Sequence, residues 1–157
     1  MKNIFRKIIG FSIAIPFTLM IYIFSAFLGK EEAIQLLGPF ATRIAKLMLI
    51  FFVPKIKNAR EFDLVPSKIK ERFWLWKPLF DYYISYEDSN IVKLYVSNCP
   101  FYEAFAKLGL REMGPYICQG DWEIAKEYFD KWDFERSHQI GTGDSFCDPT
   151  YKRKKIR

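Results

Sequence analysis

The stretch FDYYISYEDSNIVKLYV, residues 80–96, decides the fold class, because its pattern predicts a β-hairpin. Phe80 to Tyr86 and Ile91 to Val96 are dominated by aromatic and β-branched residues, which are typical of strands. The four residues between them, Glu87 to Asn90, are polar and favour a turn. Antiparallel β-structure is therefore expected near the middle of the chain.

Two short helices are expected after this hairpin. Pro100 suits the first position of a helix, where its missing N–H costs nothing. Gly109 favours the end of that helix, since glycine readily adopts the backbone conformation found at helix C-termini. A second helix is expected from Trp122 to Phe129, with the Asp121 carboxylate capping its first turn.

The last part of the chain predicts two more strands. Residues 134–140 and 146–151 have the composition of strands, and the glycine-rich segment 141–144 between them favours a turn. The sequence therefore predicts an α+β fold, in which N-terminal helices, the first one transmembrane, are followed by an antiparallel sheet interleaved with short helices.

Helices are also expected before the hairpin. Residues 31–53 place apolar side chains on one side of a helix, and Pro54 ends it. Residues 58–67 have the composition of a connection. We predict a further helix over residues 68–77, with three aromatic side chains packed inward: Phe73, Trp74 and Trp76.

An uncharged apolar run, residues 8–29, stands at the start of the chain. As a helix it reaches roughly 33 Å, about the thickness of the hydrocarbon layer of a bilayer. A cleaved signal peptide is one alternative, but bulky Phe24 stands where cleavage after Ala26 needs a small residue. A buried helix is the other, but a helix apolar on all sides needs more surrounding protein than this chain offers. We expect a single-pass membrane anchor over residues 1–29 and an α+β domain over residues 30–157.

The chain carries a net charge of +6, and its basic residues cluster beside apolar segments. Such clusters suit the anionic surface of a membrane, but they do not decide which side of it the domain faces. Nucleic acid is not an expected partner, because the chain has no zinc-finger spacing, recognition-helix pattern or RNA-binding motif. The expected partners are a small molecule and membrane lipid, which residues 8–29 would contact.

All three cysteines lie in the second half of the chain: Cys99, Cys118 and Cys147. Because three is an odd number, a disulfide framework cannot use them all, and free thiols in a reducing setting fit better. A buried thiol that only fills core space is the structural alternative for each. Cys118 stands three residues before Asp121, and a thiol at a helix start has a lowered pKa.

Four further residues suit a reaction site. His138, the only histidine, titrates near neutral pH without help, and Asp121 is a second candidate proton carrier. The structural alternative for His138 is a buried imidazole, and the structural alternative for Asp121 is a helix cap. Gly141 and Gly143 can bring backbone N–H groups close to a ligand, which stabilises a developing negative charge.

A zinc site is the metal alternative, since three cysteines and one histidine can form a closed tetrahedral set. The separations between these residues are long, and no close pair of cysteines nucleates the site. We therefore expect neither a metal nor a cofactor.

The order of these motifs resembles the L-2-amino-thiazoline-4-carboxylic acid hydrolase family. The resemblance is strongest over residues 91–152 and extends weakly to residues 29–33. Each motif is weak alone, but their order and spacing together are fairly specific. The motifs are Cys99-Pro100, Leu108-Gly109-Leu110, Cys118-x-x-Asp121, Glu135-Arg136-Ser137 and Gly143-x-x-x-Cys147-Asp148-x-x-Tyr151.

The resemblance implies opening of a cyclic thiourea-like ring by water, which gives an N-carbamoyl-cysteine. Water or a thiolate adds to the ring carbon between nitrogen and sulfur, and the sulfur leaves. The catalytic candidates are then Cys118, Asp121, His138 and Cys147. Arg136 would hold the substrate carboxylate, and the other candidates for substrate binding are Cys99, Gly141 and Gly143.

Two other classes of function stay open. The glycine-then-cysteine ending also resembles small-ligand sensor domains of the 4-vinyl-reductase type, in which helices and a sheet enclose an apolar ligand and no catalysis occurs. The third class is a membrane-bound scaffold, whose role would not depend on the cysteines.

Overall fold

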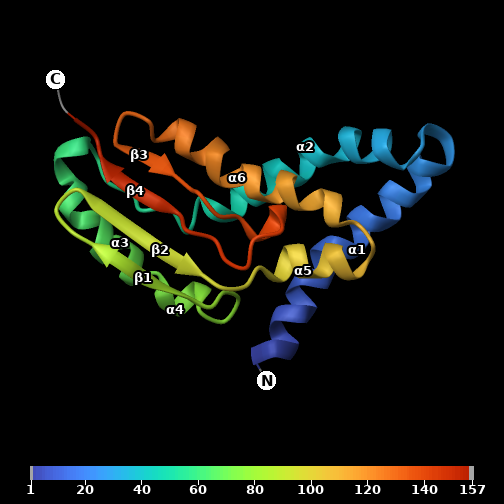
Figure 1. Cartoon of the computed structure of the whole chain (residues 1–157), viewed down its shortest axis with the longest axis horizontal. Coiled ribbons are helices and arrows are strands. Elements are labelled where there is room, and N and C mark those ends of the chain that lie inside the picture. Colours follow the sequence, from blue (N-terminus) through green and yellow to red (C-terminus); the bar gives the residue numbers. More distant parts are fainter. Residues whose placement is uncertain (1, 156–157) are drawn as a thin grey trace.

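In the computed structural model, which describes residues 2–155, two long helices form a V at one end and a four-stranded antiparallel sheet lies at the other (Figure 1). Helix α1 (Lys2–Leu28) and helix α2 (Lys30–Leu49) meet at Gly29. The φ of Gly29 is 88°, a left-handed conformation that glycine adopts without strain, so the chain can reverse there. The predicted α+β class is confirmed.

One face of α1 packs against the rest of the chain. Its buried residues recur every three or four positions and so form one stripe: Arg6, Gly10, Ala14, Thr18 and Ile21. A Cβ on Gly10 would lie 2.3 Å from the carbonyl oxygen of Pro100, so only glycine allows this close approach to helix α5 (Pro100–Lys107). Within residues 2–155, α1 is the one helix long and apolar enough to cross a membrane. The division of the chain at residue 29 stays a prediction.

Short helices connect α2 to the sheet. They are the 3-10 helix η1 (Ala59–Leu64), helix α3 (Val65–Lys70) and helix α4 (Phe73–Trp76). The single helix predicted over residues 68–77 is therefore wrong, because the chain turns between α3 and α4. Trp76 is buried as predicted, but Trp74 is 75% exposed, since residues two apart on a helix point in different directions.

The predicted hairpin is confirmed. Strand β1 (Tyr82–Glu87) pairs antiparallel with β2 (Ile91–Val96), and the Asp88 carboxylate accepts hydrogen bonds of 2.7 Å from two N–H groups in the turn. Strand β4 (Thr150–Arg153) pairs with both β2 and β3 (Trp132–Glu135), which gives the order β1-β2-β4-β3. The last strand of the chain therefore lies inside the sheet.

The two helices after the hairpin differ in how well the sequence predicts them. Helix α5 starts at Pro100 and ends before Gly109, whose φ is 77°, as predicted. After the 3-10 helix η2 (Arg111–Met113), helix α6 covers Gly114–Glu127 and starts well before the predicted position. Asp121 therefore lies in the middle of α6 and caps no helix, so its predicted capping role is wrong.

The segment between β3 and β4 is not a simple hairpin. The strands predicted over residues 134–140 and 146–151 are shorter and shifted, and a 3-10 helix, η3 (Ile140–Thr142), lies between them. A Cβ on Gly141 would lie 2.5 Å from both Cys118 Sγ and the carbonyl oxygen of Gly114. The absence of a side chain at Gly141 therefore allows η3 to rest directly on α6.

The core consists of two clusters. The helical cluster joins α1, α2 and α5 and contains Ala14, Leu37 and Phe105. The sheet cluster joins the strands to η1, α3 and the end of α6, and it contains Phe62 and Trp132. The two clusters meet beside the C-terminal end of α2, and the candidate site lies at this junction.

Candidate functional site

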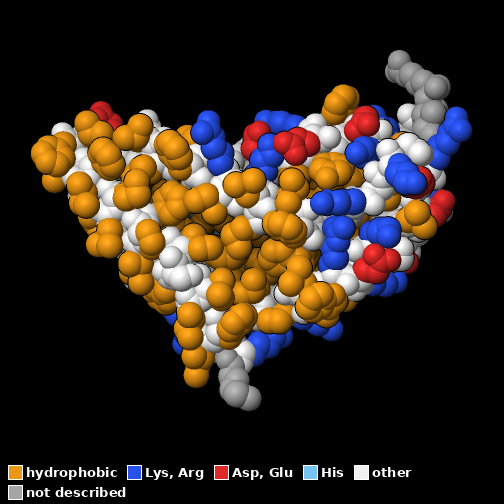
Figure 2. Space-filling view, turned by 180° about the vertical axis from the view of Figure 1, so that it is seen from behind, with side chains coloured by type: hydrophobic (Ala, Val, Ile, Leu, Met, Phe, Trp, Pro, Cys, Tyr) orange, Lys and Arg blue, Asp and Glu red, His pale blue; other side chains and the backbone are white. Residues whose placement is uncertain are grey.

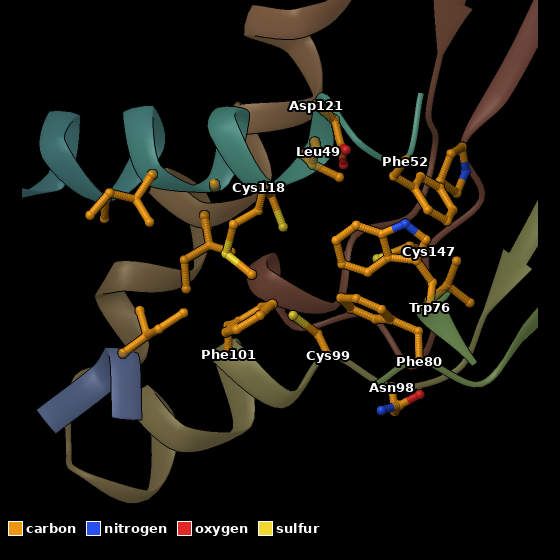
Figure 3. A pocket seen from close by; sticks show the side chains of 18 of the residues that line it. Leu49, Phe52, Trp76, Phe80, Asn98, Cys99, Phe101, Cys118, Asp121 and Cys147 are labelled. Carbon is orange, nitrogen blue, oxygen red and sulfur yellow. The ribbon is translucent and has the colours of Figure 1, made fainter. Parts of the chain in front are cut away.

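A pocket of about 130 Å³ lies between the helical cluster and the sheet cluster. Figure 3 shows the side chains that converge on it from α2, α4, α5, α6 and the loops beside the sheet. Most of the lining is apolar, with Phe17 of α1, Leu49 of α2 and Phe101 of α5 among its members. A cavity of about 150 Å³ can hold benzene, so this pocket has room for one small ring.

The polar end of the pocket is an ion pair between Asp121 of α6 and Arg136, which follows β3. Arg136 Nη1 donates to the Asp121 carboxylate. Arg136 Nη2 donates to the Cys118 carbonyl oxygen (2.8 Å) and to Gln139 Oε1 (2.6 Å). The Arg136 side chain is only 1% exposed, whereas that of Asp121 is 22% exposed. The arginine is thus fixed on three sides, and the carboxylate is the more accessible partner.

Three residues that line the pocket each carry a buried polar atom with no hydrogen-bond partner within residues 2–155: Trp76 Nε1, the Tyr82 hydroxyl and Arg136 Nε. A buried donor without a partner costs about 1–3 kcal/mol, so an acceptor atom that reaches one of these three donors would recover that cost. Trp76 and Tyr82 are site residues that the sequence does not predict. Their aromatic pattern predicts secondary structure and burial, but it does not show which polar atom stays unpaired.

All three cysteine side chains line this pocket, although they come from separate segments (Figure 3). Cys118 belongs to α6, Cys99 precedes α5, and Cys147 forms a β-bridge with Val96 beside β2. Neighbouring residues of η3 contact two of the thiols. The Ile140 N–H donates to Cys147 Sγ (3.2 Å), and Gly141 packs against Cys118 Sγ.

Burial raises the pKa of all three thiols. For Cys147 the pKa is raised to about 12, against the opposing effect of the Ile140 N–H. The pKa values of Cys99 and Cys118 shift in the same direction for the same main reason. The predicted lowering of the Cys118 pKa at a helix start is therefore wrong, because Cys118 lies inside α6. At neutral pH the thiols are protonated, and a thiolate forms only if a base takes the proton.

Asp121 is the group in the pocket best suited to move a proton. Burial raises the pKa of Asp121 above its ordinary value, and the charge and hydrogen bond of Arg136 oppose that shift. A carboxyl group whose pKa is raised exchanges protons more readily near neutral pH than an ordinary aspartate does. The arrangement can therefore support acid–base chemistry on a molecule that reaches the polar end of the pocket.

The His138 ring lies outside the pocket lining. It stacks on Phe146, with 4.4 Å between ring centroids, and its side chain is 46% exposed. Gly143 also does not line the pocket; its φ is 109° and it ends η3 at the surface. The structure thus brings five predicted site residues to one pocket, with Gly141 behind Cys118: Cys99, Cys118, Asp121, Arg136 and Cys147.

Asp148 fixes the loop that carries His138. Its carboxylate accepts hydrogen bonds from the N–H groups of Ser137 (2.9 Å) and His138 (2.6 Å) and lies 3.1 Å from Lys93 Nζ. Burial alone would raise the pKa of Asp148, but these hydrogen bonds outweigh it and lower the pKa to about 2. Asp148 is therefore ionised at neutral pH and acts as a structural anchor.

The described part of the chain, residues 2–155, contains no group of three or more histidine, cysteine, aspartate or glutamate side chains arranged to hold a metal ion. The three thiols share the pocket, but the imidazole that would complete a tetrahedral set with them does not line it. The chemistry available at the site is that of an arginine, a carboxyl group and thiols.

Comparison with known proteins gives one match. A family model described as L-2-amino-thiazoline-4-carboxylic acid hydrolase matches residues 16–151. The matched segment begins inside α1 and includes the three cysteines, Asp121 and Arg136. No curated protein and no solved structure matches the chain.

Proposed function

This chain belongs to the L-2-amino-thiazoline-4-carboxylic acid hydrolase family, and from that premise we propose that it hydrolyses the ring of a small cyclic amidine or thioether acid. The product is a thiol of the N-carbamoyl-cysteine type. One observation carries the proposal: a pocket with room for one ring is lined by an arginine–carboxylate pair and by residues whose buried polar atoms have no partner within residues 2–155.

The substrate carboxylate is the group that this wall would bind. Arg136 Nε supplies positive charge, and Trp76 Nε1 and the Tyr82 hydroxyl supply neutral donors. The apolar walls, such as Phe101, surround the ring itself. Because Arg136 is already tied to Asp121, the pocket holds no free excess charge, and the neutral donors help to bind the acid.

In the proposed reaction, water adds to the ring carbon that lies between nitrogen and sulfur. Asp121 takes a proton from this water as the carbon–oxygen bond forms. The carbon–sulfur bond then breaks and a carbonyl group forms at the same carbon. One proton of the water ends on the ring nitrogen and the other on the sulfur, so the product carries a free thiol.

The thiols of Cys118 and Cys147 would serve as protonated site thiols that donate hydrogen bonds to the leaving sulfur. Their raised pKa values favour this role over direct attack, because attack by sulfur first requires Asp121 to remove the thiol proton. His138 is the less favoured proton carrier, since its ring does not line the pocket.

The proposal is tested by incubating the full chain with a panel of cyclic amidine and thioether acids. Thiol release and mass spectrometry of the product report ring opening. We expect at least one member of the panel to be opened. We expect the double variant Cys118→Ala, Cys147→Ala to lose about tenfold or more of that rate, because alanine has no proton to donate to the leaving sulfur.

Ser145→Ala is the matched control for this double variant, because Ser145 is exposed in the same loop as Cys147. It is expected to keep the wild-type rate. Full activity of the double cysteine variant would show that the thiols have no part in the reaction. Absence of turnover with every acid of the panel would remove the hydrolase proposal.

A non-catalytic ligand-binding domain of the 4-vinyl-reductase type is the second candidate. The mostly apolar pocket lining and the protonated thiols favour it, because neither feature needs a reaction. Co-purification of a small apolar acid, bound by the chain but not converted, is the outcome that would select this candidate.

We also propose that the chain acts at a membrane, with lipid contacts over residues 8–29. The length and composition of α1 support this location. In a single-pass anchor these residues would cross the bilayer. The packing of α1 along α5 favours a different position, because it commits one side of the helix to protein.

A further inference from the structure

An extended apolar surface covers the outer sides of the two long helices. Figure 2, which views the molecule from behind, shows apolar side chains over α1, α2 and the hollow between them. The exposed large apolar side chains of α1 have exposed fractions from 37% to 82%, and those of α2 from 38% to 63%. We call this surface the apolar face; its members include Ile8, Ile15, Leu19, Ile23 and Phe27 of α1 and Leu36, Phe40, Ile44 and Leu47 of α2. Soluble monomers rarely expose a continuous apolar patch of this extent.

The other side of α1 is tied to the domain along its whole length. Near its start, Arg6 pairs with Asp81 and donates to the carbonyl oxygen of Pro78 (3.1 Å). Near its end, the Tyr22 hydroxyl donates to the carbonyl oxygen of Leu108 (3.1 Å). A helix that crosses a bilayer alone has acyl chains on all sides, and these polar contacts would then lie in lipid.

Lysines and aromatic side chains stand together at the start of α1. Lys2 and Phe5 share a shallow hollow with Trp74 and Lys77 of the α4 segment. Trp74 is the most exposed aromatic residue of this group, at 75%. Tryptophan beside lysine is typical of the membrane interface, where the ring enters the headgroup region and the amine meets phosphate. Figure 2 also shows Lys and Arg side chains along the border of the apolar face.

We propose that the chain is a monotopic membrane protein that binds an anionic bilayer. Helix α1 lies in the plane of the membrane, and the apolar face enters one leaflet. The Lys77 amine contacts lipid phosphate, the neighbouring Lys2 amine pairs with Asp81 (2.7 Å), and Trp74 anchors the interface. At about 1.5 Å per residue the 27 residues of α1 extend over about 40 Å along the surface.

An anionic leaflet explains two observations together: the exposed apolar residues on both long helices, and the lysines beside Trp74. Other occupants of the apolar face would explain only one of them. A second copy of the chain would cover the apolar face but would not need lysines beside Trp74. A crossing helix would use the apolar residues of α1 but not those of α2, and it would break the contacts of Arg6 and Tyr22. An anionic leaflet satisfies the apolar residues of both helices and the lysines together.

The test is flotation of the full chain with two kinds of vesicle, phosphatidylcholine alone and phosphatidylcholine mixed with phosphatidylglycerol. We expect the chain to float with the mixed vesicles and to bind the neutral ones more weakly. Leu47→Glu should lower binding by about tenfold or more, because it places a charge where an apolar side chain enters the leaflet. Phe129→Glu is the matched control, since Phe129 is 66% exposed but lies beyond α6 beside Lys154.

An epitope tag before Lys2 reports the position of α1. In the proposed arrangement, protease added outside the vesicles removes the tag, because both ends of α1 stay on one side. A protected tag would contradict the in-plane position. If Leu47→Glu binds vesicles as well as the wild type does, the apolar face does not bind lipid. If the wild type is a dimer and Leu47→Glu is a monomer that still binds vesicles, the apolar face is a contact between two copies of the chain. None of these readouts depends on ring opening, so they hold or fail independently of the hydrolase proposal.

Discussion

Replacing Asp121 by asparagine is expected to lower the rate of ring opening by about 10²–10⁴-fold, the usual contribution of a general acid or base. Among residues 2–155, Asp121 is the one carboxylate that lines the pocket, and burial raises its pKa. It is therefore the group best placed to accept a proton from water. Thiol release at saturating substrate, compared between the variant and the wild type, measures the effect.

Glu123→Gln is the matched control for Asp121→Asn. Glu123 lies on the same helix, but its side chain is 33% exposed and pairs with Lys126. It is expected to keep the wild-type rate, and so is His138→Ala. If Asp121→Asn keeps the wild-type rate and His138→Ala loses it, the imidazole is the proton carrier and the assignment to Asp121 fails.

Replacing Arg136 by methionine is expected to lower the free energy of unfolding by about 3–5 kcal/mol. The Arg136 side chain is 1% exposed, and its removal leaves Asp121 as a charge without a partner. The Cys118 carbonyl oxygen and Gln139 lose a donor at the same time. Urea unfolding at neutral pH, followed by circular dichroism, measures the difference.

A double variant separates the effect of the ion pair on the stability of the protein from its effect on ring opening. Asp121→Leu added to Arg136→Met removes both charges, and it is expected to recover most of the lost stability while ring opening stays lost. Arg111→Met is the control, because Arg111 is exposed in η2. Equal stability of Arg136→Met and the wild type would show that the pair is not buried as described.

The sequence predicts the elements whose signals are local. The hairpin follows from two aromatic and β-branched runs around a polar turn, and α5 follows from Pro100 at its start and Gly109 at its end. The sequence predicts too late a start for α6, because Asp121 is a typical capping residue; Pro115 in the first turn is the better signal for the start of this helix. Gly120 suggests a break in α6, but the helix continues through it. Glycine stands there because α2 lies close: a Cβ on Gly120 would lie 2.8 Å from Ala45 Cβ.

The candidate site depends on contacts that no local pattern encodes. The ion pair joins Asp121 to Arg136, fifteen residues later in the chain, across the space between α6 and the end of β3. The sequence suggests both residues separately, through the family resemblance, but not that each is the partner of the other. Trp76 and Tyr82 enter the pocket because α4 and β1 fold against the end of α2, which only the tertiary structure determines.

The proposed complex places the acceptor atoms of a small ring acid beside buried donors that have no partner within residues 2–155. Proton–nitrogen correlation spectra of the four tryptophan indole groups measure this contact, on addition of 2-amino-thiazoline-4-carboxylate or another acid of the panel. Within residues 2–155, Trp76 and Trp132 both have a buried Nε1 without a partner, and of these two Trp76 lines the pocket while Trp132 does not. We expect the Trp76 signal to move as its N–H gains an acceptor, while the Trp132 signal stays in place. If the Trp76 signal does not move when an acid binds, or if both tryptophan signals shift equally, the proposed binding mode is wrong.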